Sequence, residues 1–411
     1  MIQLDVKTAF LHGELEEEIY MEQPEGFVSP GRERDVCRLI KSLYGLKQAP
    51  RCWNIKFNSF LLKFGLTRAA SDSCIYYRRQ GEEFTIVVIF VDDGLVCSNQ
   101  PKILSAILTH LRTEFEMTTS EADRYLGLNI IRDRSCRQLF VNQHHYVQSI
   151  LKKFNMTKCN PKTIPADPNA RMSVEMAPNS ENAAREMSTV PYREAIGSLM
   201  YLMVMTRPDI AFAVHQVSQY CQNPGPGHWN GVKRILAYLA GTSDHGFLYG
   251  WNEGEPLIGY CDADYAGDTD KRRSTTGYVF LHYGGPVAWS SKRQTCTALS
   301  TTEAEFVAAC EASKEATWLL HLLQELGVKE SGPVTLMSDN QSAIRVINNT
   351  EFHQRTKHID VKYNYIRDQQ TNGTIDVKYV CTNQQLGDLF TKPLPTPRFQ
   401  SLRDQIGIKK F

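Results

Sequence analysis

The sequence predicts a mixed α/β chain that is divided into several domains. Its 411 residues correspond to two to four domains at the usual ~100–200 residues each. Strand-like apolar runs occur in the first and last thirds of the chain, whereas apolar residues at helical spacing dominate residues 191–249. A composition of 42% hydrophobic and 22% charged residues is that of a globular protein, which excludes wholesale disorder.

Targeting signals and cysteine patterns are missing from the sequence. No apolar run approaches the ~18–20 residues of a membrane-spanning helix, so no membrane partner is expected. The N-terminus lacks the basic segment and apolar stretch of a secretory signal. The 11 cysteines are scattered without a C-x2-C pair, which gives little support to a zinc ribbon or a disulfide framework. Isolated thiols are typical of a reducing, intracellular compartment.

The net charge of +1 does not by itself indicate a nucleic-acid partner, but the charge is unevenly distributed. Residues 1–31 contain seven acids and one lysine, a balance of −6, whereas residues 32–68 contain nine basic residues and two acids, a balance of +7. Such a run is either a solvated face or a positive wall along a groove. The whole-chain charge therefore hides basic segments and excludes no nucleic acid.

The first strand-like segments contain a group of acidic residues. Residues 85–91 and 95–97 are two apolar runs, with Asp92-Asp93-Gly94 between them. We expect a hairpin whose turn is Asp92-Asp93-Gly94, because Asp-Gly supplies the positive φ that hairpin turns need. Asp5 lies in a short apolar segment upstream. Carboxylates at strand ends can hold two Mg²⁺ ions, although Asp-Asp-Gly is alternatively only a turn, and Asp5 alone is uninformative.

The middle of the chain is expected to contain a linker and a helical region. Residues 160–191 include five prolines among small and polar residues, which is typical of a linker. Residues 191–249 follow with helical periodicity, and an alternating strand and helix pattern extends from Leu257 to Lys392.

This last region contains a second set of acids. Leu257–Asp262 and Pro333–Asp339 each read as a strand that ends in aspartate, with a helix from about Gln341, and two such ends side by side would form a two-metal site. Each acid is alternatively a helix cap or a surface charge.

Positions in the predicted helices distinguish structural acids from candidate metal ligands among the remaining residues. Ser300–Glu303 is a capping box in which Glu303 is expected to reach back to the Ser300 N–H, so Glu303 is structural. Glu305 shares a helical face with alanines and can point into the site. A cap at Thr382 and Gln385 would place Asp388 in the second turn of a late helix.

Three motifs of the first part resemble the palm of copia-type LTR-retrotransposon reverse transcriptases: DVKTAFLHG at 5–13, LYGLKQAP at 43–50 and FVDD at 90–93. The resemblance implies that Asp5, Asp92 and Asp93 hold two Mg²⁺ ions, for which Mn²⁺ can substitute. It also implies that Phe10 is the steric gate against a ribose 2′-OH. The alternative is that Phe10 is a core residue on a strand.

Further segments extend this resemblance. Residues 47–50 look like the segment beneath the templating base, so Lys47, Gln48 and Arg51 are candidate substrate-binding residues, with solvated helix-cap charges as the alternative. Residues 126–130 resemble a primer grip and 146–156 a thumb helix. In this family a fingers subdomain precedes the first aspartate, and without it we expect the polymerase half to be impaired.

Four ordered blocks resemble the copia-type ribonuclease H domain: GYCDAD at 259–264, STTEAE at 300–305, SDNQSA at 338–343 and LGDLFTKP at 386–393. The resemblance implies a second metal site formed by Asp262, Glu305, Asp339 and Asp388, with two Mg²⁺ ions and Asp264 as the alternative first ligand. TKHID at 356–360 also matches, and His358 is either an aid to product release or a helix cap.

We therefore expect a palm without fingers at 1–142, a thumb helix at 143–160, a linker at 161–190, a connection at 191–253, a ribonuclease H domain at 254–395 and a tail at 396–411. The implied function is RNA-directed DNA polymerase with ribonuclease H activity. Its implied partners are an RNA template, a DNA primer, an RNA–DNA hybrid, dNTPs and other Pol or Gag products. The implied location is the cytoplasm, in a virus-like particle, or the nucleus. The alternative is a non-catalytic or domesticated nucleic-acid-binding remnant.

Overall fold

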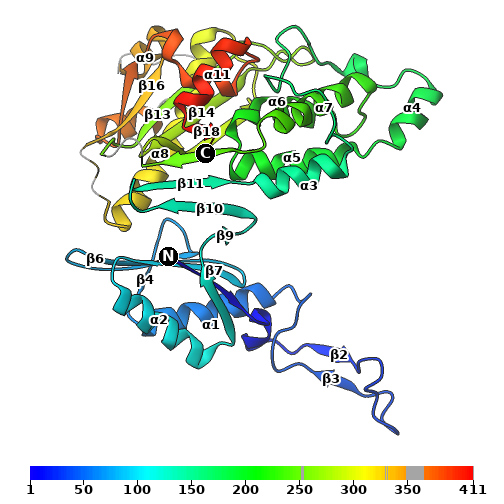
Figure 1. Ribbon diagram of the computed structural model, residues 1–411, viewed down its shortest axis with the longest axis vertical. Coiled ribbons are helices and arrows are strands. Elements are labelled where there is room, and N and C mark those ends of the chain that lie inside the picture. Colours follow the sequence, from blue (N-terminus) through cyan, green and yellow to red (C-terminus); the bar gives the residue numbers. More distant parts are fainter. Residues whose placement is uncertain (251–253, 329, 331, 349–364, 411) are drawn as a thin grey trace. The chain divides into compact units, whose positions relative to one another are not determined.

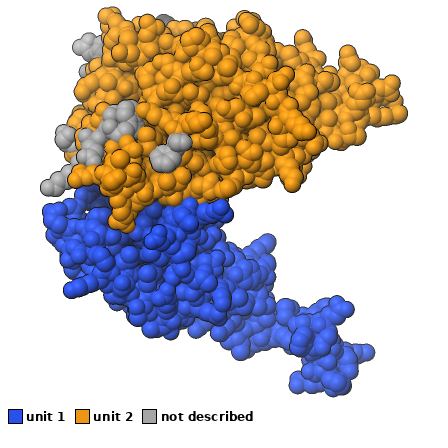
Figure 2. Space-filling view, in the orientation of Figure 1, with its two compact units in different colours: residues 1–126, 322–328 blue, residues 127–321, 329–411 orange. Residues whose placement is uncertain are grey.

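The computed structural model describes residues 1–410 except 251–253, 329, 331 and 349–364. The chain forms two compact units (Figure 2): residues 1–126 with 322–328, and residues 127–321 with 329–411. Within the described ranges, no helix combines the length and the hydropathy that are needed to cross a bilayer.

Unit 1 is built on a six-stranded sheet with the order β4-β5-β6-β7-β1-β8. Its strands are β1 (Ile2–Val6), β4 (Thr67–Arg68), β5 (Ile75–Gln80), β6 (Glu83–Phe90), β7 (Asp93–Ser98) and β8 (Met117–Glu121). The helices α1 (Ala49–Lys63) and α2 (Pro101–Glu114) pack against this sheet (Figure 1). Trp53, Phe57 and Leu61 of α1 are buried because their spacing of four residues places them on one helical face.

Unit 1 also contains three shorter strands and one 3-10 turn. They are β2 (Tyr20–Glu22), β3 (Val36–Arg38), β9 (Arg124–Tyr125) and the turn η1 (Ala9–His12). Strands β2 and β3 form a separate two-stranded sheet.

The predicted hairpin is present, but its turn lies elsewhere. Strands β6 and β7 pair with Phe90 opposite Asp93, so Val91 and Asp92 form the turn, and Val91 takes the positive φ of 59°. Gly94 lies within β7, opposite Leu4 of β1, and a Cβ on Gly94 would lie 2.6 Å from Leu4 Cδ1. This glycine is therefore needed for close approach of two strands, and the predicted Asp-Gly turn is wrong.

In unit 2, a first layer joins strands that are far apart in the sequence. Strands β10 (Leu128–Asp133), β11 (Gln138–Asn142), β12 (His245–Tyr249) and β18 (Ile408–Lys410) pair in this order, each antiparallel to the next. The helical part comprises α3 (His144–Lys153), η2 (Val174–Met176), α4 (Glu181–Ser188), α5 (Tyr192–Met205), η3 (Pro208–Ile210), α6 (Ala211–Ser218) and α7 (Pro226–Gly241). Helices α3, α5, α6 and α7 share one buried core.

The second layer of unit 2 is a five-stranded mixed sheet with the order β15-β14-β13-β16-β17. It consists of β13 (Ile258–Ala263), β14 (Thr275–His282), β15 (Gly285–Arg293), β16 (Val334–Ser338) and β17 (Ile375–Tyr379). The three-strand meander β13–β15 is antiparallel, β16 pairs in parallel with β13, and β17 pairs in parallel with β16. The accompanying helices are α8 (Thr301–Glu325), α9 (Gln341–Asn348), η4 (Thr382–Gln384), η5 (Leu386–Phe390) and α11 (Thr396–Gln405). The strands and helices that the structure describes within residues 258–405 thus form a mixed α/β layer.

Three domain boundaries differ from those expected from the sequence. The first unit ends at Leu126 instead of 142, because β10 and β11 pair with β12. The helical region ends before residues 245–249, which form the strand β12. The supposed tail at 396–411 is part of the unit 2 core, since its α11 and β18 bury Leu402 and Ile408.

Candidate functional site

Three acids of unit 2 converge at the ends of neighbouring strands. Asp262 lies near the end of β13, Asp339 directly follows β16, and Glu305 is in the second turn of α8. The parallel register that pairs Tyr260 with Met337 places Asp262 level with Asp339 by the same offset. One carboxylate oxygen from each of the three residues lies within 4.8 Å of the others. In the described part of the chain, no other set of three His, Cys, Asp or Glu residues has ligand atoms this close together.

Local helix chemistry explains why Glu305, and not Glu303, enters this cluster. The Ser300 Oγ accepts a hydrogen bond of 3.1 Å from the Glu303 N–H, and the Glu303 carboxylate accepts one of 2.8 Å from the Leu299 N–H. The structural role predicted for Glu303 is therefore confirmed, although its donor is Leu299 instead of Ser300. Two residues later, Glu305 lies on the buried alanine face of α8 and is only 7% exposed.

The electrostatics of the cluster favour a bound cation. Burial raises the pKa of Glu305 far above its usual value, and the neighbouring charges of Asp262 and Asp339 raise it further. Burial also raises the pKa of Asp262. The Glu305 Oε2 atom is buried without a hydrogen-bond partner. Crowded carboxylates with an unsatisfied oxygen are the hard-ligand set that divalent ions take, so these residues fit a metal.

Asp388 lies beside this cluster but is engaged by basic side chains. It is buried on η5, with Lys392 Nζ 2.6 Å from its Oδ1 and Arg398 Nη2 2.5 Å from its Oδ2. Lys392 also lies 3.7 Å from Asp262 Oδ2. The 3-10 turn η5 approaches β13 closely because of Gly387, whose Cβ, if present, would lie 2.7 Å from the Asp262 Cβ. The structure thus places Asp388 next to the triad, with its charge already balanced.

The predicted cap of this last segment differs in detail. Gln385, instead of Thr382, caps η5, since its side chain accepts a hydrogen bond of 3.0 Å from the Gly387 N–H. The segment is a 3-10 turn and not an α-helix. The Thr382 hydroxyl donates to Asp339 Oδ2 at 2.7 Å, and the Thr391 hydroxyl donates to Asp262 Oδ2. These two threonines therefore orient two carboxylates of the cluster.

The alternative first ligand, Asp264, is not part of the cluster. Its carboxylate accepts a hydrogen bond from the Thr275 N–H, and burial raises its pKa to about 7. The geometry therefore favours Asp262 as the first ligand. His358 lies outside the described residues.

In unit 1, the predicted aspartates lie near one another without forming an equivalent cluster. Asp5 of β1 is directly opposite Asp93 of β7, and Asp92 is in the adjoining turn. Burial raises the pKa of Asp93, and the charges of Asp92 and Asp5 raise it further. The three carboxylates are thus electrostatically coupled, but they do not reach the mutual spacing that the unit 2 triad has.

The turn that holds Asp92 is fixed from two sides. The Trp53 Nε1–H donates to the Val91 carbonyl at 2.6 Å, and the Val6 N–H donates to the Asp92 carbonyl at 2.9 Å. A β-branched residue at positive φ is strained, so Val91 adopts this conformation only because its surroundings impose it. Sequence reasoning missed Trp53.

The predicted substrate-binding residues lie around the start of α1. Phe10 lies on η1 and not on a strand, half-buried, with its ring centroid 4.9 Å from that of Tyr44. Gln48 is the residue before α1, and Lys47 and Arg51 flank it with exposed side chains. Two exposed cations at a helix N-terminus form an anion-attracting surface.

Sequence reasoning also missed the basic partners of Asp388. Lys392 lies within the LFTKP block, and its spacing of four residues from Asp388 was the available signal. Arg398 gave no signal, because α11 was taken for a tail.

Comparisons with known proteins identify the family of the chain. Residues 1–168 match the family model described as reverse transcriptase (RNA-dependent DNA polymerase). The chain is 45% identical over 409 residues to the retrovirus-related Pol polyprotein from transposon TNT 1-94 of Nicotiana tabacum, which covers 99% of this chain and 31% of the relative. It is 32% identical over 323 residues to a putative transposon Ty5-1 protein of Saccharomyces cerevisiae, covering 76% of this chain and 100% of that protein.

Among solved structures, a foamy viral protease-reverse transcriptase in complex with an RNA/DNA hybrid is a distant likeness. It has 13% identity and a TM-score of 0.45, covering 96% of this chain and 45% of that one. Nearly the whole chain matches the plant Pol polyproteins, but it spans only about a third of their length. The family model matches the first 168 residues, and the relatives match nearly the whole chain or are themselves covered completely. The chain therefore belongs to the retrovirus-related Pol polyproteins of copia-type transposons.

Proposed function

We propose that this chain is the polymerase and ribonuclease H portion of a copia-type Pol polyprotein, and that it hydrolyses the RNA strand of an RNA–DNA hybrid at the unit 2 triad. The observation that carries this proposal is the convergence of Asp262, Glu305 and Asp339 around the unsatisfied Glu305 Oε2. The proposed partners are an RNA template, a DNA primer, their hybrid, dNTPs and other Pol or Gag products. The proposed place of action is a cytoplasmic virus-like particle or the nucleus.

The triad would hold the metal, and Asp388 would join it as a fourth ligand once Lys392 and Arg398 release it. Two Mg²⁺ ions, when bound, would polarise the scissile phosphate and lower the pKa of the attacking water. The chain's own contribution is orientation: Thr391 and Thr382 donate to Asp262 and Asp339 and so fix the direction of both carboxylates. The Lys392 ammonium, which is partly exposed beside them, would attract the phosphate backbone.

For unit 1 we propose nucleotide addition at Asp5, Asp92 and Asp93, again with Mg²⁺. Phe10 would stand against the C2′ of the incoming nucleotide, and Lys47, Gln48 and Arg51 would contact the template strand and phosphates. These three aspartates are less tightly grouped than the unit 2 triad.

The nuclease proposal is tested with the recombinant full chain and a labelled RNA–DNA hybrid. With Mg²⁺, and with Mn²⁺ as substitute, the hybrid should be cut, and Asp339→Asn should abolish cleavage. The matched control is Asp376→Asn on β17, whose carboxylate pairs with Lys378 at 3.1 Å away from the triad. Unchanged cleavage by Asp339→Asn would refute the site, and hybrid binding without any cleavage would support the non-catalytic alternative.

The polymerase proposal is tested by primer extension on an RNA template. Extension should be weak and should be lost in Asp93→Asn, while the exposed Asp123→Asn of the same unit serves as control. Extension that survives Asp93→Asn would exclude these aspartates as the site.

A further inference from the structure

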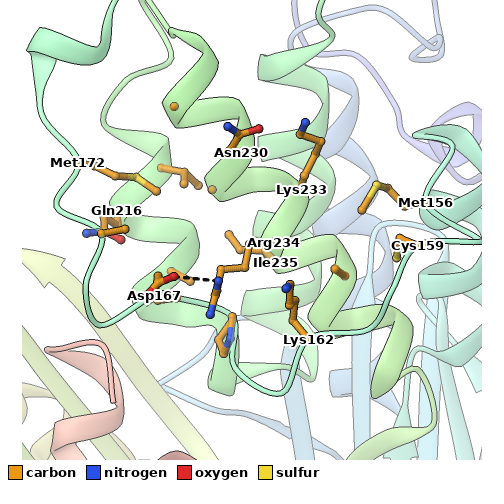
Figure 3. A pocket seen from close by; sticks show the side chains of 18 of the residues that line it. Met156, Cys159, Lys162, Asp167, Met172, Gln216, Asn230, Lys233, Arg234 and Ile235 are labelled. Atoms are coloured by element: carbon orange, nitrogen blue, oxygen red, sulfur yellow. Dashed lines mark hydrogen bonds and ion pairs between the residues drawn. The ribbon is translucent and has the colours of Figure 1, made fainter. Parts of the chain in front are cut away.

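Unit 2 contains a cavity of about 530 Å³ between α6, α7 and the segment 156–176 (Figure 3). This volume lies within the ~300–1,000 Å³ range of small-molecule sites. Its walls are mostly apolar, with Met156, Met172, Val217 and Ile235 among the lining side chains. The cavity is far from neutral, however, and three cations also line it.

Two glycines on α7 let methionines of the covering segment pack close to the helix. A Cβ on Gly231 would lie 2.2 Å from Met172 Cε, and a Cβ on Gly227 would lie 2.9 Å from Met176 Sδ. A side chain at either position would therefore displace a methionine that covers the helix. Methionine side chains are flexible, so this wall can adapt to the shape of a ligand.

The segment that covers the cavity is fastened at both ends. At one end, the Lys162 N–H donates to the Ala237 carbonyl at 3.1 Å. At the other, the Thr269 hydroxyl donates to the Met172 carbonyl at 2.8 Å, and the Val174 N–H donates to Asp270 Oδ1 at 3.1 Å. The segment is thus held across α7 by polar bonds while the space beneath it stays open.

The charges on the walls are unbalanced. Figure 3 shows Arg234 in the middle of the view, between Asp167 and Lys162. Arg234 Nη1 pairs with Asp167 Oδ2 at 3.0 Å, but Arg234 Nε is buried without a hydrogen-bond partner. Lys162 and Lys233 are exposed, and among the described residues neither forms an ion pair with a carboxylate. Three cations against one carboxylate, with one buried donor unsatisfied, call for an anionic acceptor.

We propose that this cavity binds a small amphiphilic anion, a carboxylate or phosphate monoester with an apolar chain. The anionic head would accept hydrogen bonds from Arg234 and attract Lys162 and Lys233, while the apolar body would lie against the methionines and Ile235. The site is separate from both carboxylate groups, and the proposal does not depend on the proposed nuclease or polymerase activity.

The test is isothermal titration calorimetry on the full chain with octanoate, octyl phosphate, the neutral octanamide and inorganic phosphate. Octanoate and octyl phosphate should bind, and their relative affinities decide whether the head is a carboxylate or a phosphate. Octanamide should bind roughly tenfold more weakly or worse, since it lacks the charge that strengthens hydrogen bonds to arginine. Inorganic phosphate should also be weaker, because it lacks the apolar body.

Two variants and a control locate the site. Arg234→Gln should weaken octanoate binding about tenfold, and Ala213→Leu, which fills the apolar part of the cavity from α6, should weaken it independently. The matched control is Arg185→Gln on α4, an exposed arginine that pairs with Glu181 of the same helix. No binding to the unmodified chain, equal affinity for octanoate and octanamide, equal affinity for inorganic and octyl phosphate, or binding unaffected in both variants would each overturn the proposal.

Discussion

The guanidinium of Arg207 donates two parallel hydrogen bonds to the carboxylate of Asp209, 2.9 Å from Nε to Oδ1 and 2.8 Å from Nη2 to Oδ2. Both side chains are buried, and the Tyr238 hydroxyl donates a further bond of 2.5 Å to Asp209 Oδ2. Burial by itself raises the pKa of Asp209, but Arg207 and Tyr238 outweigh it and hold this pKa below its usual value. The network joins η3 to α7 at the centre of unit 2.

Asp209→Ala should destabilise unit 2 by about 3–5 kcal/mol, because it leaves the Arg207 charge buried without its partner. The free energy of unfolding, measured by urea denaturation, reports this loss. The double variant Asp209→Ala/Arg207→Met should recover part of it, since no unpaired charge remains. If the single variant unfolds no more easily than the unmodified chain, the ion pair contributes nothing to stability.

The acids of unit 2 were predicted as a set from the resemblance to the ribonuclease H domain, and local signals supported three of them. Asp262 and Asp339 each come at the end of a strand-like segment, and one capping pattern separates Glu303 from Glu305. The ion pair of Asp388 with Arg398 was not predictable in this way, because it depends on how α11 folds back on η5. Likewise, the unit boundary depends on pairing between β11 and β12, which are about a hundred residues apart in the chain.

In the turn of unit 1, a local sequence signal was present but predicted the wrong turn residues. Asp-Gly is a strong local turn signal, yet tertiary contacts prevail: Leu4 requires Gly94 inside the strand, and Trp53 holds Val91 in the turn. Local propensity loses here because the two long-range contacts together determine the register of the hairpin.

Trp53→Phe should destabilise unit 1 by about 1–2 kcal/mol, because the Val91 carbonyl loses the hydrogen bond that offsets its strained backbone. The measurement is urea denaturation, with Trp318→Phe on α8 as the control for loss of an indole. In a Val91→Gly background the cost of Trp53→Phe should shrink, since glycine adopts positive φ without strain. Equal costs in both backgrounds would show that the indole and the strained turn are independent.

Stability should also depend on pH through His215. Burial lowers the pKa of this histidine to about 4, with the charges of Arg293 and Lys292 lowering it further, and its Nε2 accepts a bond of 3.1 Å from the Arg293 N–H. The unfolded chain binds a proton at this histidine near pH 6.5, whereas the folded chain does not. The contribution of neutral His215 to the free energy of unfolding is therefore fully present above pH 6.5. It is lost as pH falls toward 4, by roughly 3 kcal/mol in all.

Urea denaturation at pH 7 and pH 5 measures this effect. The fall in unfolding free energy between the two pH values should be smaller in His215→Gln than in the unmodified chain. The exposed His321→Gln serves as control and should leave the difference unchanged. An identical pH dependence in His215→Gln would assign the effect to other groups.

Lys392 should compete with divalent metal at the unit 2 triad. Its ammonium lies 3.7 Å from Asp262 and 2.6 Å from Asp388, so it occupies the region in which a cation would be attracted. Lys392→Met removes one positive charge, and Mg²⁺ or Mn²⁺ affinity should rise roughly three- to tenfold at neutral pH. Calorimetric titration measures this affinity without relying on catalysis, and Lys378→Met on β17 is the matched control.

Two outcomes would change this interpretation of Lys392. If hybrid cleavage falls in Lys392→Met while metal affinity rises, the lysine also acts on the phosphate backbone. If metal affinity falls, the lysine is a structural support of the triad and not a competitor.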